Sequence, residues 1–318
     1  MGITRDLVAK EANVSSATVS RVFNNPNAVS PELRKKVLDV SKKLNYIPNK
    51  AASQLRRSGT GVIAVVKVEK SNRAYYWGSF KLFDWFYAQA QKGLLNAIEN
   101  TSYQLSFYNI KNKKELIDIS RRVDGVIGYD IDTKEEELLF EKLDIPCVLA
   151  HHIQPNNKMI HVSTNNIFGG ELQGKFLLNK NVKNPLYISG YIDQVLSHTQ
   201  RLMGIKNIYP NINILDFDFL NKLEIKKMIN HILDIVKKEN CDGIAFVNDL
   251  VLVKTISKLN LNIPIIGYDG APYISLIEDV ASIDFNISII YEKSLLKLIE
   301  LINGKKVLGE IVLPTLLI

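Results

Sequence analysis

Hydrophobic residues in the first part of the chain recur at the three- and four-residue spacing of short amphipathic helices. Thr4 can cap a first helix whose apolar positions Leu7, Val8 and Ala12 face inward. Asn13 suits the left-handed residue that a tight turn into a second helix requires. The pattern therefore predicts two short helices joined by a tight turn.

The second helix is predicted over residues 15–23, with Ser15 as its cap, and it stops at Asn24-Asn25-Pro26. One face is apolar, and the other carries Ser16, Ala17, Ser20 and Arg21. Small side chains allow a close approach to DNA, and an arginine can pair with guanine through two hydrogen bonds. Such a helix suits the DNA major groove. Helices of this composition also occur in ordinary domains, so the flanking sequence decides between the two interpretations.

A third helix is predicted from Ser30-Pro31-Glu32, with Ser30 as N-cap and Pro31 at the first helical position. A further helical pattern covers residues 50–57 and ends at Ser58-Gly59-Thr60-Gly61. That helix is too short to be stable alone. It is either a linker with nascent helix or a hinge that folds on DNA and presents Leu55 to the minor groove.

The positive charge of the chain is concentrated in this head. Residues 1–60 hold eleven Lys and Arg against four Asp and Glu, an excess that accounts for the whole net charge of +7. A basic patch is often only a solvated surface. A compact basic unit joined to a neutral remainder is nevertheless what a nucleic-acid-binding module requires.

From residue 61 onward, short apolar runs alternate with amphipathic stretches. The runs predict strands over residues 62–66, 105–108, 123–129, 146–150, 186–190, 212–215, 244–247 and 265–268. Helices are predicted over residues 86–99, 134–143, 168–178, 220–238, 250–259 and 287–302. This alternation favours an α/β fold with parallel sheets, and the number of units favours two doubly wound subdomains with a cleft between them.

Composition narrows the class of protein further. No apolar stretch is long enough to span a bilayer and we expect no secretory leader, which predicts a cytoplasmic protein without a membrane partner. Cys147 and Cys241 are expected to be buried thiols. The acidic run 135–137 is interpreted as a solvated helix face, and His151-His152 as a surface or pocket-rim pair. We therefore expect neither a metal nor a cofactor.

The head contains, in order, Val14-Ser15, Ala17-Thr18-Val19-Ser20-Arg21-Val22, Asn24, Val29-Ser30, Leu44-Asn45-Tyr46-Ile47-Pro48-Asn49, Ala51 and Leu55. This set resembles the DNA-binding head and hinge of the lactose/galactose repressor family of bacterial transcription regulators. Two residues depart from the family pattern. Asn13 stands where glycine is usual, and Arg5 stands where an apolar residue is usual.

The resemblance implies a helix-turn-helix head (residues 1–48), a hinge helix with linker (49–60) and a periplasmic-binding-protein-like body (61–318). The body would contain an N-subdomain of residues 61–164 and 286–308 and a C-subdomain of residues 165–285 and 309–318. The chain would cross between them near Thr164, Phe285 and Leu308. One further strand and no tetramer-forming tail are expected after Leu308, so the resemblance implies a homodimer.

The resemblance also places residues at DNA. Ser16, Ala17 and Arg21 would read bases, and Leu55 would insert at the centre of a palindromic double-stranded operator. The full set expected at DNA is Thr4, Ser15, Ser16, Ala17, Ser20, Arg21, Asn24, Ser30, Ala52 and Leu55.

Three polar positions match the inducer contacts of the family. Arg201 is predicted to open a helix after the 186–190 strand, Asn248 follows the 244–247 strand, and Asp269 closes Ile-Gly-Tyr-Asp. A planar multi-donor group, an amide and a carboxylate suit the hydroxyls of a small sugar. Each residue has a plainer interpretation, as a solvated helix residue or a helix cap.

Eight aromatic residues, including both tryptophans, lie between Tyr75 and Tyr87. The stretch 84–93 is similar to one in family members that respond to galactosides, with Trp85 where proline is usual. Trp85, Phe86 and Phe217 are therefore expected beside a sugar ring, galactose or a galactoside. Packing within the subdomain or at a dimer interface explains most of these rings equally well.

Three functions remain open. The first is a repressor that releases DNA when a sugar closes the cleft. The second is a regulator of the same family whose main effector is a phosphorylated carrier protein that acts as corepressor. The third is an enzyme that acts on sugars or nucleotides; because the chain lacks the phosphate-loop, dinucleotide, nucleophile-elbow and zinc-protease motifs, we expect no enzyme.

Overall fold

The computed structural model describes residues 4–24, 28–44, 46, 59–69, 84–131, 133–151, 159–192, 195–218, 222–259 and 261–317. The chain divides into two compact units. The first comprises residues 1–62 and 98–104, and the second comprises residues 63–97 and 105–318.

Three helices surround a small apolar core in the first unit. They are α1 (Arg5–Glu11), α2 (Ser16–Asn24) and α3 (Pro31–Lys43). Val8, Val19 and Val37, one from each helix, are fully buried. The prediction that Leu7 faces inward is wrong, because its side chain is 39% exposed and Ala9 is buried instead. A seven-residue helix turns only part of its surface toward the core, and Leu7 lies at the edge of that part.

Local hydrogen bonds define the helix ends at the predicted residues. Thr4 Oγ1 accepts a backbone hydrogen bond of 3.3 Å at the start of α1, and Ser30 Oγ accepts one of 3.4 Å at the start of α3. Ser15 Oγ accepts one of 3.1 Å at the start of α2. Asn13 has φ of 50°, the left-handed conformation predicted for the turn. The expected caps and turn are confirmed.

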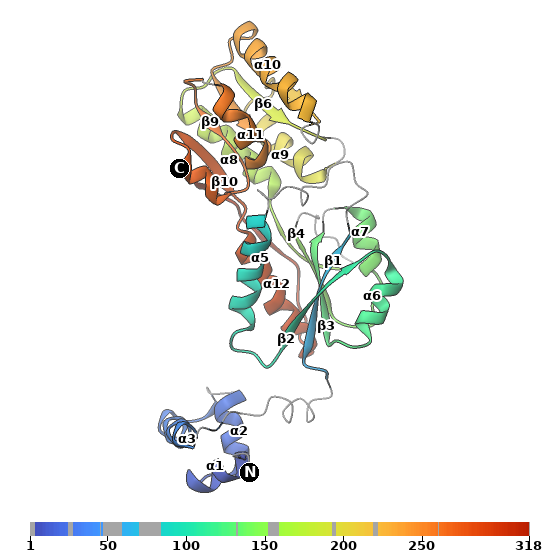
Figure 1. Ribbon diagram of the computed structural model, residues 1–318, viewed down its shortest axis with the longest axis vertical. Helices are drawn as coiled ribbons and strands as arrows, with labels where there is room; N and C mark the ends of the chain where they lie inside the picture. Colours follow the sequence, from blue (N-terminus) through green and yellow to red (C-terminus); the bar gives the residue numbers. More distant parts are fainter. Residues whose placement is uncertain are drawn as a thin grey trace. The chain divides into compact units, whose positions relative to one another are not determined.

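Two six-stranded sheets dominate the second unit (Figure 1), and their strand orders are β11-β5-β4-β3-β1-β2 and β12-β10-β9-β8-β6-β7. The first contains β1 (Val62–Val68), β2 (Gln104–Ile110), β3 (Gly125–Ile131), β4 (Cys147–His151), β5 (Ile160–Thr164) and β11 (Glu310–Val312). The second contains β6 (Pro185–Ser189), β7 (Asn213–Asp216), β8 (Gly243–Phe246), β9 (Ile265–Ile266), β10 (Val280–Asp284) and β12 (Thr315–Leu317). Within the second sheet β12 pairs antiparallel with β10, and β6 to β10 pair in parallel.

Helices cover both faces of the first sheet, with α5 (Asp84–Ile98) and α12 (Ile287–Ile302) on one face and α6 (Lys113–Ser120) and α7 (Lys134–Phe140) on the other (Figure 1). In the second sheet, α8 (Asn166–Asn179) contacts β8, β9, β10 and β12 and packs closely on α9 (Leu196–Lys206). α10 (Lys222–Lys238) packs on α11 (Asp249–Leu259), which contacts β8, and the short helix η4 (Pro272–Leu276) contacts β10. Burial on both faces explains why the central strands β1, β3, β6 and β8 are nearly continuous apolar runs.

The structure contains strands that the hydrophobic pattern did not predict. β5 and β10 were missed because polar residues interrupt their sequences, Ile-His-Val-Ser-Thr and Val-Ala-Ser-Ile-Asp. β11 pairs with β5 up to Val312, opposite Thr164. The chain therefore leaves the first sheet after Val312 and not near Leu308, because this pairing continues past the predicted crossing.

The acidic run in α7 is not a solvated face, contrary to the interpretation from sequence. Glu136 and Glu137 are buried. Glu136 completes a reciprocal capping box with Thr133, and Glu137 pairs with Lys134 at 2.5 Å and with the buried His161 at 3.3 Å. Hydrogen bonds and ion pairs allow these carboxylates to be buried.

Both cysteines are free thiols. Cys241 is buried as predicted, whereas Cys147 is only half-buried. Within the described residues, no cluster of three or more His, Cys, Asp and Glu is arranged to hold a metal ion. None of the described helices has the length and apolar character needed to cross a membrane.

Candidate functional site

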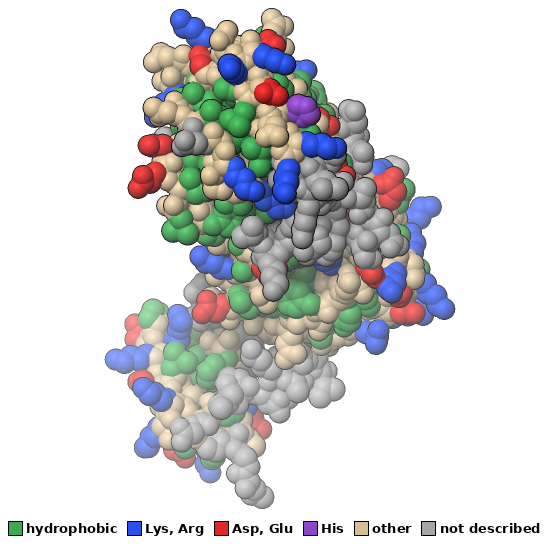
Figure 2. Space-filling model, turned by 45° about the horizontal axis from the view of Figure 1, so that its top comes forward, with side chains coloured by type: hydrophobic (Ala, Val, Ile, Leu, Met, Phe, Trp, Pro, Cys, Tyr) green, Lys and Arg blue, Asp and Glu red, His purple; other side chains and the backbone are tan. Residues whose placement is uncertain are grey.

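The outer face of α2 presents the residues that were predicted to read DNA bases. Ala17 and Arg21 are exposed, and Ser16 and Ser20 are half-buried. Val19 and Val22, on the opposite face, are buried in the head. Figure 2 shows Lys and Arg side chains projecting from the surface of the three-helix unit. The helix therefore has the predicted division into an apolar face and an accessible polar face.

The remaining residues predicted at DNA belong either to helix ends or to the hinge. The hydroxyl groups of Thr4, Ser15 and Ser30 cap the three helices, which places each of them at a helix N-terminus. Helix N-termini attract phosphate through their free N–H groups and the helix dipole. Asn24 is the last residue of α2. The hinge residues Ala52 and Leu55 lie outside the described residues.

Arg201 is the centre of a buried polar cluster in the second unit. It lies within α9, which begins at Leu196, so the prediction that Arg201 opens the helix is wrong: the helix starts one and a half turns earlier. Its side chain is 2% exposed. Arg201 Nε donates to Asn166 Oδ1 at 3.2 Å, and Nη1 donates to the carbonyl oxygen of Val247 at 2.8 Å.

The guanidinium of Arg201 also pairs with the third predicted position. Arg201 Nη1 lies 3.2 Å from Asp269 Oδ1, and the guanidinium carbon lies 3.7 Å from the centre of the Tyr268 ring. Asp269 has φ of 121°, a conformation that a residue with a side chain rarely adopts. Strain of this kind is typical of functional sites. The structure thus brings Arg201 and Asp269 together.

A second carboxylate adjoins this pair. Asp249, the first residue of α11, is fully buried and accepts hydrogen bonds of 2.8 Å from the Ala271 N–H and the Ser282 hydroxyl. Burial raises the pKa of Asp269 to about 7, although the Arg201 guanidinium opposes the shift. Burial, with a smaller repulsion from Asp269, raises the pKa of Asp249 well above its ordinary range. Buried carboxyl groups with raised pKa values are typical of binding sites.

Asn248 has the plainer of its two predicted roles. Its side chain is buried, and Oδ1 accepts the Val251 N–H at 2.9 Å, which caps α11. The hydrogen bond occupies the carbonyl oxygen of the amide. A contact between the side-chain NH2 of Asn248 and a ligand stays a prediction.

The three aromatic candidates have different surroundings. Phe86 is fully buried, with its ring 6.4 Å from Tyr129 and 6.5 Å from Tyr291. Its predicted place beside a ligand is therefore wrong, because packing in the core removes its whole surface. Trp85 is half-buried. Burial raises the pKa of Tyr273, which Trp85 influences in the opposite direction.

Phe217 directly follows β7, at the carboxyl end of the strand. Its N–H donates to the Ser189 carbonyl oxygen at 3.1 Å, which ties it to the end of the neighbouring β6. The ring is half-buried and lies 5.7 Å from His231. This edge of a parallel sheet is where ligands of doubly wound folds bind.

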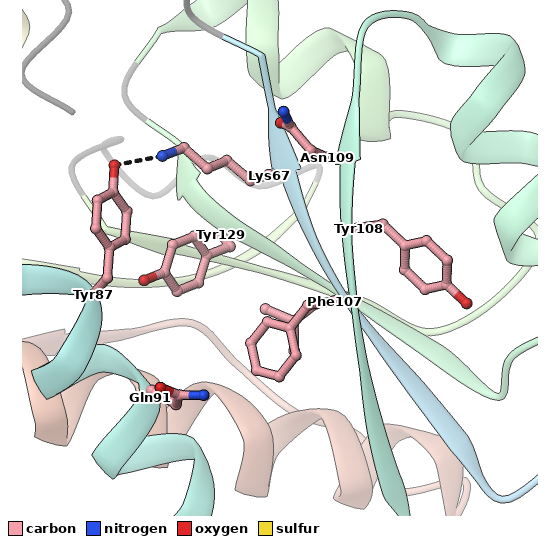
Figure 3. Close-up of a pocket in the computed structure, with 8 residues that line it drawn as sticks. Lys67, Tyr87, Gln91, Phe107, Tyr108, Asn109 and Tyr129 are labelled. Carbon is pink, nitrogen blue, oxygen red and sulfur yellow. Dashed lines mark hydrogen bonds between the residues drawn. The ribbon is translucent and has the colours of Figure 1, made fainter. Parts of the chain in front are cut away.

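A cavity of about 370 Å³ lies elsewhere, between α5 and the first sheet (Figure 3). Tyr87 and Tyr129 stack on one side of it, and the Lys67 ammonium forms a hydrogen bond with the Tyr87 hydroxyl. Phe107, on the edge strand β2, is 53% exposed at its opening. None of the residues predicted at a ligand lines this cavity.

Sequence reasoning missed two members of the Arg201 cluster. Asn166 binds Arg201 through Oδ1, and Tyr268 stacks on the guanidinium. Asn166 follows the polar end of β5, a strand that was not predicted, so no signal placed it at a strand end. Tyr268 was assigned to a strand, where an aromatic residue is ordinary.

Comparisons with known proteins agree with both units. Residues 6–49 match the family described as bacterial regulatory proteins, lacI family. The transcriptional regulator RegA of Clostridium saccharobutylicum is 28% identical over 273 residues, which cover 81% of this chain and 78% of that protein. It is named as a helix-turn-helix transcriptional regulator.

Solved structures resemble nearly the whole chain. The transcriptional regulator CelR in complex with cellobiose has a TM-score of 0.66 and 21% identity, covering 99% of this chain and 98% of that one. The lac repressor dimer bound to operator and an anti-inducer has a TM-score of 0.61 and 20% identity, covering 100% and 98%. The predicted fold, a helix-turn-helix head followed by a periplasmic-binding-protein-like body, is confirmed. Residues 6–49 thus resemble the DNA-binding part of the lacI family, and most of the chain resembles a helix-turn-helix transcriptional regulator.

Proposed function

We propose that this protein is a dimeric repressor that binds a palindromic operator and releases it when a small sugar binds in the second unit. The buried pair of Arg201 and Asp269 carries the effector part of the proposal. In this pair the Arg201 guanidinium, which can donate several hydrogen bonds, lies against the Asp269 carboxylate. Both residues belong to the part of the second unit that contains the second sheet. The exposed polar face of α2 supports the DNA-binding part.

The chemistry of the cluster suits a polyhydroxylated ligand. Sugar hydroxyls both donate and accept hydrogen bonds. They can therefore bind to the arginine and the carboxylate at once, so that neither buried charge lacks a hydrogen-bond partner. Asp269 accepts from hydroxyl groups, and Arg201 donates to hydroxyl or ring oxygens. Trp85 and Phe217 supply aromatic faces for the apolar side of the sugar.

The identity of the sugar is a finer question. The similarity of residues 84–93 to galactoside-responsive regulators favours galactose or a galactoside as the first candidate. The structurally similar CelR was solved with cellobiose, so cellobiose is the second candidate to be tested. A purine is the third probe, because it is a planar ligand without sugar hydroxyls.

For the DNA part, Ser16, Ala17 and Arg21 read bases, and Leu55 enters the minor groove at the operator centre. The lac repressor relative was solved as a dimer on its operator, which supports two copies of this chain on a palindromic site. Sugar binding and operator binding are coupled, so each weakens the other. The sugar favours an arrangement of the body in which the paired hinges no longer hold Leu55 in the groove.

The effector proposal is tested with the full-length protein and a DNA duplex selected from a randomised pool. Operator affinity is measured by fluorescence anisotropy with galactose, lactose, cellobiose and a purine in turn. We expect one sugar to weaken binding at least about tenfold, a coupling in the usual range for allosteric proteins. Asp269→Asn removes the carboxylate charge and keeps its shape, so this response should be lost while operator binding without sugar persists.

Asp234→Asn is the matched control, because Asp234 is exposed on α10. It should respond to the sugar as the parent protein does. An unchanged sugar response in Asp269→Asn, with direct sugar binding retained in calorimetry, would remove Asp269 from the site. Operator binding that no sugar alters and that a phosphorylated carrier protein strengthens would replace the sugar with a protein corepressor.

The hinge role of Leu55 has its own test. Leu55→Ala should weaken binding to the selected operator much more than binding to a random duplex, because only the specific complex contains the wedge. Equal losses on both duplexes would count against a wedge.

A further inference from the structure

An acidic residue lies against the DNA-reading helix of a strongly basic head. Asp6 is in the first turn of α1, and its side chain is 75% exposed. Its Oδ1 accepts a hydrogen bond from the hydroxyl of Ser16, the first residue of α2. Arg5 Nη2 lies 3.5 Å from the same carboxylate oxygen. The contact joins the two helices of the helix-turn-helix at its exposed surface.

This hydrogen bond changes what Ser16 can recognise. A serine hydroxyl has one hydrogen to donate and two lone pairs that accept, so a free serine contacts either a donor or an acceptor on a base. In this head the hydrogen is directed to Asp6. Ser16 is left with lone pairs only, and the neighbouring carboxylate is also an acceptor.

We propose that Asp6 and Ser16 together form an acceptor-only reading surface that selects an amino-bearing base, cytosine or adenine, in the major groove. Cytosine N4 and adenine N6 donate there, whereas guanine O6 and thymine O4 accept and would face lone pairs. Asp6 is a positioning residue for Ser16, and its carboxylate is itself a partner for cytosine N4. The inference rests on the proposed role of α2 as the reading helix.

The charge of Asp6 has a second, separable effect. The head otherwise attracts phosphates through its excess of Lys and Arg, and an exposed carboxylate at the DNA-facing surface weakens that attraction for every sequence. Removal of the charge should therefore raise non-specific affinity. Removal of the acceptor should broaden the base preference at one position of each half-site.

Three variants of the full-length protein separate these effects: Asp6→Ala, Asp6→Asn and Glu11→Ala. Each is used to select duplexes from a randomised pool, and dissociation constants are measured on the selected and single-base-changed sites. The parent protein should prefer cytosine or adenine at the Ser16 position by at least about fivefold, the low end for a good base contact. Asp6→Ala should reduce that preference to less than about twofold.

Asp6→Asn keeps an oxygen that accepts from Ser16 but has no charge, so it should retain the base preference and bind random duplexes more tightly. Glu11→Ala removes an exposed acid at the other end of α1 and should leave the base preference unchanged. Circular dichroism establishes that each variant is folded.

A folded Asp6→Ala protein that keeps the full preference would overturn the inference, as would a parent protein that prefers guanine or thymine at this position. A folded parent protein that selects no duplex at all would instead contradict the proposed function, so the two failures are distinguishable.

Discussion

Nδ1 of His198 lies 2.6 Å from the carbonyl oxygen of Gly190, in the loop that follows β6. A carbonyl oxygen only accepts, so the imidazole carries its hydrogen on Nδ1. His198 is buried on α9, the helix that also carries Arg201. The hydrogen bond therefore anchors the Arg201 helix to the end of a strand.

Burial, aided by the Arg201 charge, lowers the pKa of His198 to about 3. The unfolded chain binds the proton near pH 6.5 and the folded protein does not, so stability is lost as the pH falls from about 6.5 toward 3. This histidine contributes a slope of up to about 1.4 kcal/mol per pH unit. The unfolding free energy is measured by urea denaturation at pH values across this range. We expect it to fall less with decreasing pH in His198→Asn than in the parent protein.

Asp249 and Asp269 act in the opposite sense, because their raised pKa values favour proton uptake by the folded protein. The informative quantity is therefore the difference between variant and parent. His231→Asn, at an exposed site on α10, provides the control. Identical pH profiles for His198→Asn and the parent protein would contradict the prediction.

Two glycines allow helices α8 and α9 to pack closely together. A Cβ at Gly204 would lie 1.9 Å from the Ile167 carbonyl oxygen, and one at Gly170 would lie 2.0 Å from the Arg201 carbonyl oxygen. Because both neighbours are backbone atoms, Gly204→Ala must separate the helices and should lower the unfolding free energy by about 3 kcal/mol. Thermal denaturation measures the loss.

Met203→Ala is the control for that substitution, because Met203 occupies the adjacent position and is 52% exposed. It should change the unfolding free energy by less than about 0.5 kcal/mol. Equal stabilities for the two variants would show that the helices can separate without cost.

Gln173 joins the end of β8 to the residue that follows β9. Its side chain is fully buried, and Nε2 donates to the carbonyl oxygens of Phe246 at 2.8 Å and Gly267 at 3.0 Å. Gln173→Leu removes both hydrogen bonds, and we expect it to lower the unfolding free energy by about 2 kcal/mol. Asn179→Leu, at the exposed end of the same helix, should have little effect in the same urea titration.

The thiol of Cys147 should be unreactive in the folded protein. Desolvation of the sulfur raises its pKa to about 12, so little of the reactive thiolate is present at pH 8. Burial also raises the pKa of Cys241. Labelling with iodoacetamide, followed by mass spectrometry, should modify both residues quickly in urea and slowly in buffer. Rapid modification of Cys147 in buffer would contradict this assignment.

The sequence by itself determined the features that depend on neighbouring residues. Thr4, Ser30 and Asn13 act as predicted, because a cap or a left-handed turn is a hydrogen bond or a dihedral angle within a few positions of the chain. The buried central strands could be predicted for a related reason, since burial on both faces requires continuous apolar runs.

Only the tertiary structure decided which distant residues meet. The pair of Arg201 with Asp269 and the contact of Asp6 with Ser16 each join separate elements. Phe86 and Glu137 show the same limit in reverse. The sequence suggested a place beside a ligand for Phe86 and a solvated face for Glu137, but packing against other elements buries both. Periodicity indicates which face of an element is apolar. Whether a polar or aromatic side chain is buried depends on partners from elsewhere in the chain, and these are brought to it only by the complete fold.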